Sequence, residues 1–249
     1  MYKKAVRFLK LVLIIIITSC GSEKTSNLKL MDIFSNGMVL QQKATTKIWG
    51  ISNPNEIINI KSSWGEISSV KSDLNGNWIT EIVTPDAGGP YSLKISNGIK
   101  TKEISDILIG EVWFASGQSN MEMPLQGYLP AEPIDNAEEE ILNSLNKNIR
   151  MFTVTNNVTL SKIDTVDGEW LNSNPQNSRN FSATAYFFAK KLQKDLNIPI
   201  GIISSSWGGT PAESWVSEEK LRTLKEFEDD INELHVRYDK FQNKSVPLR

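Results

Sequence analysis

The chain has 249 residues, with 27 basic and 29 acidic side chains, so it shows no basic excess that would point to nucleic acid. Hydrophobic residues make up 39% and charged residues 22%, which excludes a disordered tail and a protein with many membrane spans. One cysteine and one histidine exclude an internal disulfide framework and a multi-Cys or His-rich metal site. We therefore expect no Cys-rich or His-rich metal site and no nucleic-acid partner, in a chain long enough for one to two domains. We also expect no cofactor.

The first residues are typical of a bacterial export signal. Four basic side chains precede an unbroken apolar run at 11–17, which is too short to span a bilayer, and small residues follow. Cys20 lies where the resemblance to a lipoprotein lipobox implies lipidation, which predicts a signal over 1–19 and a linker over 20–27. A membrane contact through this lipid alone would place the protein in the cell envelope. A cleaved signal with an incidental cysteine and an uncleaved anchor are the alternatives.

Residues 28–105 are typical of a small antiparallel β-sandwich that serves as an accessory domain. Asn75-Gly76 and Asn97-Gly98 predict tight turns, because both residue types tolerate positive φ. Apolar and polar residues alternate over 91–95, as in a half-buried strand. The other expected strands are 46–49, 56–61, 64–70 and 78–83.

Residues 106–249 predict an α/β domain, because apolar strands alternate with helical patterns. Apolar side chains recur at helical spacing over 181–196, and again over 218–241, where we expect one long helix. The expected strands are 107–115, 149–154 and 200–204. Such a pattern favours a parallel sheet with helices on its faces.

The first candidate site segment is 110–121, where an apolar strand ends in a turn of small residues. Ser119 is the candidate nucleophile, Gly117 permits the sharp turn, and nearby N–H groups could donate to an oxyanion. Met121 excludes the G-x-S-x-G motif of the α/β-hydrolases. The alternative is a strand-ending turn with a capping serine.

The second candidate site segment is 201–215, where another strand enters a glycine-rich turn. Gly208 and Gly209 leave their N–H groups open to an anion or a carbonyl oxygen. Trp207 and Trp215 could offer flat faces to a sugar ring, and Glu213 is counted with them as a substrate-binding candidate. The alternative is a turn packed by two core tryptophans.

Segments 110–121 and 205–215, with the stretch at 33–42, resemble the sialate O-acetylesterase family of SGNH-type carbohydrate esterases. The resemblance implies a three-layer α/β/α flavodoxin-like hydrolase domain that removes acetyl groups from glycans or sialic acid without a metal. It implies Ser119 as nucleophile, and an oxyanion hole formed by the Ser119 amide and the block around Gly208 and Gly209. The candidate turn residues are Gly117, Gln118, Asn120, Gly208 and Gly209.

The sequence also departs from that family. Members of that family have a Gln-Gly-Glu block and a late Asp-x-x-His segment that supplies the general base. This sequence contains neither of them. His235 follows Asn232 instead of Asp at the −3 position, and we interpret it as a helix-surface residue without a catalytic role. The chain therefore resembles the N-terminal part of a longer enzyme, with impaired activity expected. A non-catalytic glycan-binding lipoprotein and an inactive fragment are the alternatives; the sugar and the oligomeric state stay open.

Five further carboxylates could suggest a metal site or support for the serine turn, but they have simpler interpretations. The run Glu138-Glu139-Glu140 is typical of a solvated helix face. Asp106 and Glu111 flank the strand before the serine turn, and we expect structural roles for both.

Overall fold

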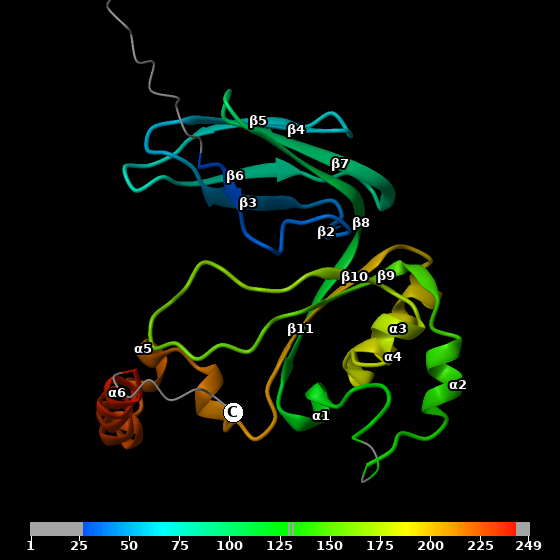
Figure 1. Ribbon diagram of the computed structural model, residues 1–249, viewed down its shortest axis with the longest axis vertical. Coiled ribbons are helices and arrows are strands. Elements are labelled where there is room, and N and C mark those ends of the chain that lie inside the picture. The colour runs from blue at the N-terminus through cyan, green and yellow to red at the C-terminus, as the bar shows by residue number, and fades with distance from the viewer. Residues whose placement is uncertain (1–26, 129, 131, 243–249) are drawn as a thin grey trace, which may run out of the picture.

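The computed structural model describes residues 27–128, 130 and 132–242 (Figure 1). The predicted signal over 1–19, most of the linker and Cys20 lie outside the described residues. Within the described part, no helix combines the length and the apolar character needed to cross a membrane.

The N-terminal part is a pair of facing antiparallel sheets, as the sequence predicts. Side chains alternate between buried and exposed along β4, with Ile58 and Ile60 inward, and Leu93 and Ile95 of β7 are buried beside them. One sheet has the order β1-β3-β6, and the other contains β7, β4 and β5 beside β8. The strands are β1 (Lys29–Leu30), β3 (Thr45–Ile51), β4 (Ile57–Ser62), β5 (Ile67–Lys71), β6 (Asn77–Val83) and β7 (Gly88–Ser96).

Both predicted tight turns are confirmed. Gly76 has φ +87° and Gly98 has φ +84°, a conformation that costs glycine little. The carboxylate of Asp73 accepts the N–H groups of Asn75 and Asn77 at 2.8 Å each, which fixes the β5–β6 turn. Local side-chain chemistry is therefore sufficient to set these connections.

Strand β8 (Thr101–Gly117) is the longest element and belongs to both halves of the molecule (Figure 1). Its first half pairs antiparallel with β7, and its second half pairs parallel with β11 (Ile200–Ser206). Between the two halves the ladder shifts register and Asp106 adopts φ +56°. The predicted boundary between residues 105 and 106 falls at this irregularity, inside one continuous strand.

The C-terminal part is a mixed α/β layer in which β9 (Asn146–Thr153), β11 and β8 run parallel. Two short strands that the sequence did not predict extend the sheet: β10 (Trp170–Ser173) antiparallel to β9, and β2 (Val39–Gln41) parallel to β8. The predicted α/β class, with an antiparallel sheet before it, is confirmed.

Helices α2 (Ala137–Leu142) and α4 (Ala183–Leu196) cover one face of this sheet. Ile200 and Ile202 of β11 pack there against α4, while Ile203 points to the other face. That other face shares one continuous core with the N-terminal sandwich. The two parts of the described chain therefore support each other through apolar packing.

Helix α4 confirms the prediction for 181–196 within two residues. Ser182 caps it by accepting the N–H of Ala185 at 3.1 Å, and Asn197 ends it in the left-handed conformation with φ +54°. The short helix α3 (Pro175–Ser178) precedes it.

The prediction of one helix over 218–241 is wrong. The structure has α5 (Glu218–Leu221), a 3-10 turn η2 (Lys225–Phe227) and α6 (Glu228–Gln242). The interruption falls at Leu224, whose backbone is extended, after the Thr223 hydroxyl donates to the Lys220 carbonyl at 2.6 Å. The spacing of apolar residues does not reveal this break in the helix, because the break coincides with a local hydrogen bond from a side-chain hydroxyl to the backbone.

An ion pair ties the two parts together near the bend in β8. Arg150 of β9 donates to both carboxylate oxygens of Asp106, at 2.7 and 3.1 Å, and its side chain is only 10% exposed. The segment 33–42 lies at the same seam: Gly37 has no side chain to obstruct the guanidinium, which a Cβ would approach to 2.9 Å. Gln42 donates to Glu111 at 2.9 Å across the same seam. Asp106 and Glu111 thus have the structural surroundings that we expected.

We predict that Asp106→Asn lowers the free energy of unfolding by about 1–3 kcal/mol, because the largely buried Arg150 loses its charged partner. Asparagine tolerates the left-handed backbone at this position, so the change isolates the charge. Urea unfolding measures the effect. Asp86→Asn, in the exposed Lys43–Asp86 pair, is the control and should leave the midpoint unchanged. Equal midpoints for both variants would contradict the prediction.

Candidate active site

Ser119 lies where β8 ends and the short helix α1 (Ser119–Glu122) begins. The turn depends on Gly117, whose φ of +151° disfavours other residues and whose added Cβ would lie 3.3 Å from Met121. Ser119 is exposed at this edge of the sheet. The serine is therefore presented to solvent at the carboxyl end of a parallel strand, where sites in open α/β sheets form.

Parallel pairing brings the second segment beside the first. Ser206 of β11 is aligned with Gly117 of β8, and the N–H of Trp207 donates to the Gly117 carbonyl at 3.0 Å. The segments that follow β8 and β11 therefore leave the sheet at the same edge. The turn formed by residues 207–209, called here the glycine turn, follows directly.

The glycine turn lies against the nucleophile candidate. A Cβ added to Gly208 would be 3.6 Å from both Cα and Cβ of Ser119, so the two backbones are in close contact. The Gly208 N–H already donates to Oε2 of Glu122 at 2.8 Å. Gly209 has φ +75° and open space around its Cβ position. Of the two glycine amides, that of Gly208 is therefore already engaged with a carboxylate.

Gln118 and Asn120 hold helix α1 in place through their backbones. The Gln118 carbonyl accepts the N–H groups of Met121 and Glu122, and the Asn120 carbonyl accepts the hydroxyl of Thr184 on α4 at 2.9 Å. Both residues are exposed. They position the serine turn against α4.

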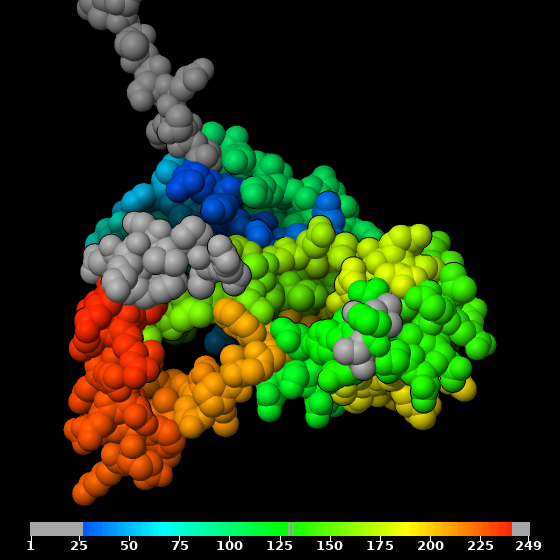
Figure 2. All heavy atoms as spheres, turned by 60° about the horizontal axis from the view of Figure 1, so that its bottom comes forward, coloured from blue at the N-terminus to red at the C-terminus, as the bar shows by residue number. Residues whose placement is uncertain are grey.

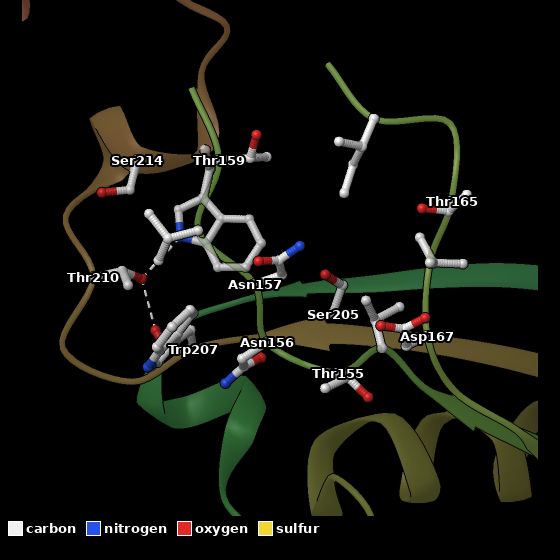
Figure 3. A pocket seen from close by; sticks show the side chains of 15 residues that line it. Thr155, Asn156, Asn157, Thr159, Thr165, Asp167, Ser205, Trp207, Thr210 and Ser214 are labelled. Atoms are coloured by element: carbon white, nitrogen blue, oxygen red, sulfur yellow. Dashed lines mark hydrogen bonds between the residues drawn. The ribbon is translucent and has the colours of Figure 1, made fainter. Parts of the chain in front are cut away.

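A cavity of about 460 Å³ opens beside the glycine turn and contains both tryptophans (Figure 3). The Nε1–H of Trp215 donates to the Thr210 hydroxyl at 2.9 Å, and that hydroxyl donates to the Trp207 carbonyl at 2.6 Å. The opposite wall is the loop 154–167, and Figure 2 shows the opening between this yellow-green segment and the orange chain after β11.

The lining of this cavity combines indoles with small polar groups. Asn156, Asn157, Thr155 and Ser205 line the cavity together with the two tryptophans. Flat apolar faces together with amides and hydroxyls suit a polyol ring. Glu213 is exposed on the 3-10 turn η1 (Ala212–Trp215) and is not among the lining residues.

His235 lies on α6, which both views place apart from α1 (Figures 1 and 2). Its Nε2 is 2.8 Å from Oε2 of Glu218. The pKa of Glu218 is lowered, first by the hydrogen bond from Arg222 and then by the one with His235. The surroundings of His235 are therefore those of a hydrogen-bonded side chain on a helix surface.

The acidic run on α2 has ion-pair partners. Glu138 pairs with Arg179 at 2.6 Å, while Glu140 accepts the Tyr186 hydroxyl at 2.9 Å and contacts Lys190. Across the described ranges, no three His, Cys, Asp or Glu side chains gather closely enough to hold a metal ion.

Glu122 is the site residue that the sequence reasoning missed. A signal was present, because Ser119 and Glu122 have the S-x-x-E spacing of a capping box. The carboxylate does not serve that purpose here but reaches Gly208, 86 residues away in sequence. Only the folded arrangement reveals this partner.

Comparisons with known proteins find curated relatives and a solved structure that are similar to this chain. No family model matches the chain. Sialate O-acetylesterase from Rattus norvegicus is 29% identical over 232 residues, which is 85% of this chain and 42% of that protein. The Homo sapiens sialate O-acetylesterase is 30% identical over 208 residues, 76% of this chain and 38% of that protein. A crystal structure of a carbohydrate acetylesterase from Xanthomonas citri matches with a TM-score of 0.71 and 33% identity, over 76% of this chain and 42% of that one.

The fold and the comparisons thus place the chain with α/β proteins of the carbohydrate esterase class. The chain belongs to the sialate O-acetylesterase family, as the resemblance of its sequence motifs implied. It spans about two fifths of the length of the curated relatives it matches.

Proposed function

We propose that this protein hydrolyses acetyl esters on carbohydrates, with Ser119 as the nucleophile. The observation that carries the proposal is the contact between Ser119 and Gly208 at the shared carboxyl edge of β8 and β11. In this proposal, the acetyl carbonyl lies between the Ser119 hydroxyl and the glycine turn, and the Gly209 amide faces its oxygen. Family membership adds the acetyl group as the chemistry.

In the proposed reaction, the Ser119 oxygen attacks the acetyl carbonyl carbon while a general base takes its proton. The amides of Ser119 and Gly209 stabilise the oxyanion. The bond to the sugar oxygen then breaks, and that oxygen receives the proton. Water hydrolyses the acetyl-serine, which releases acetate and restores the hydroxyl.

The general base is the missing part of this proposal. His235 is engaged with Glu218. The matches cover about two fifths of the relatives, and we place the base in the part of their fold that lies outside the matched region. We expect the chain described here to turn over about 10⁴–10⁶-fold more slowly than a complete site, by analogy with serine hydrolases that lack a triad member.

We predict that Ser119→Ala abolishes the remaining hydrolysis of p-nitrophenyl acetate and the acetyl adduct on residue 119. Acetate release and peptide mass spectrometry after a short incubation measure both. Ser116→Ala, which removes another exposed hydroxyl at the end of the same strand, is the matched control and should behave as wild type. Acetate release at the wild-type rate by Ser119→Ala would rule out this nucleophile.

Glycan binding without turnover is a second candidate function, and the indole-lined cavity favours it. We propose that Trp207 and Trp215 pack against the sugar ring while the amides and hydroxyls opposite accept and donate hydrogen bonds. In the esterase, the same cavity would hold the glycan whose acetyl group reaches Ser119.

Trp215→Ala should weaken binding of acetylated methyl glycosides about tenfold, since an aromatic contact contributes about 1.4 kcal/mol. Titration calorimetry measures the affinity. Trp113→Ala is the control, because Trp113 is 44% exposed against 42% for Trp215 but packs on Phe188 of α4. An equal loss in both variants, or in neither, would contradict a sugar site in the cavity. Binding in the absence of any Ser119-dependent acetate release would favour the non-catalytic function.

We propose further that the protein is held in the cell envelope by a lipid on Cys20. The support is the basic, apolar and small-residue pattern of residues 3–21. In a bacterial host, Cys20→Ser should abolish incorporation of an alkyne fatty acid and move the protein out of the membrane fraction. Lys24→Ser is the control and should keep the label. Unchanged labelling of Cys20→Ser would disprove the anchor.

A further inference from the structure

Glu122 connects three segments around the nucleophile candidate. It closes helix α1, and its Oε2 accepts the N–H of Gly208 in the glycine turn at 2.8 Å. The same carboxylate interacts with Tyr128, whose pKa is raised first by burial and then by the charge of Glu122 and a hydrogen bond with it. Tyr128 belongs to the loop after α1, which is closed by reciprocal backbone hydrogen bonds with Glu132 at 2.8 and 2.9 Å.

The contact with Gly208 is so close that any other residue at this position would displace the Glu122 carboxylate. A Cβ at this position would lie 2.6 Å from Oε2 of Glu122, which is far inside van der Waals contact. The carboxylate therefore lies directly against the turn backbone. Its hydrogen bond is charge-assisted, and such bonds are roughly twice as strong as neutral ones.

This hydrogen bond decides which amide is available to a substrate. Because the Gly208 N–H is committed to Glu122, it cannot also donate to an oxyanion. The next amide belongs to Gly209, which has positive φ. An amide donor contributes most to catalysis when its direction is set before charge develops on the substrate.

We infer that Glu122 is a positioning residue, which holds the glycine turn against Ser119 and thereby aims the Gly209 amide at the oxyanion. This role rests on the proposed esterase function. Glu122 acts through the turn and does not touch the reacting atoms. The Trp207 to Gly117 hydrogen bond fixes the start of the turn, and Glu122 fixes its middle.

Three variants test the inference. Glu122→Gln keeps an oxygen that can accept from Gly208, so kcat should stay within about threefold of wild type. Glu122→Ala removes the acceptor and should lower kcat for p-nitrophenyl acetate about 10–100-fold, with KM changed by less than about threefold. Glu139→Ala, which removes an exposed carboxylate on α2, is the control and should match wild type.

Amide hydrogen exchange at Gly208, followed by NMR, supplies a readout that does not depend on turnover. The exchange rate should rise at least about tenfold in Glu122→Ala and stay near wild type in Glu122→Gln. Should Glu122→Ala fail to fold, Glu122→Met fills similar space without an acceptor and carries the same expectations.

The outcomes separate this inference from the function on which it rests. Wild-type kcat in Glu122→Ala, or wild-type protection of Gly208 in that variant, would overturn the positioning role. If wild type releases no more acetate than Ser119→Ala, the proposed function fails instead, and the Gly208 exchange rates alone decide whether Glu122 holds the turn.

Discussion

Parallel hydrogen bonding between β8 and β11 is the constraint on which the rest of the site depends. Gly117 and Ser206 are aligned at the end of this ladder, so the segments that follow the two strands leave the sheet at the same edge. An antiparallel pairing would send one of them to the opposite edge. Ile202 and Ile203 pack on opposite faces of β11 and fix the strand between two apolar layers. Burial on both faces keeps the register from slipping, since a shift by one residue would exchange its faces.

The N-terminal sandwich contributes to the same constraint. Strand β8 pairs with β7 of the sandwich and with β11 of the α/β part, and the apolar core is continuous from the sandwich to one face of the α/β sheet. Segment 33–42 lines the seam, where the Trp170 indole donates to the Ile33 carbonyl at 2.9 Å and Val112 donates to Gln41 at 2.9 Å. The sandwich therefore holds the strand that presents the serine, which explains why this segment accompanies the two site motifs in one chain.

The serine turn and the glycine turn combine flexible residue types with a fixed geometry. Gly117 and Gly208 permit backbone positions that other residues would obstruct, but glycine alone would leave the turns loose. Hydrogen bonds from Trp207 to Gly117 and from Gly208 to Glu122 remove that freedom. Under the proposed function, this fixed backbone would orient the remaining donors before the substrate arrives.

The sequence by itself determined the elements whose causes are local. Turns at Gly76 and Gly98, the capped helix α4 and the strands β8 and β11 follow from positive φ, side-chain caps and apolar runs. The motif around Ser119 was also evident, because a strand-ending turn of small residues is a local pattern. Only the tertiary structure decided which groups meet. The Glu122 carboxylate finds Gly208 from 86 residues away, and the Asp106–Arg150 pair and the indole-lined cavity join segments that share no sequence pattern. Such contacts depend on strand register and on helix placement, and these are set by packing of the whole core and not by any one segment.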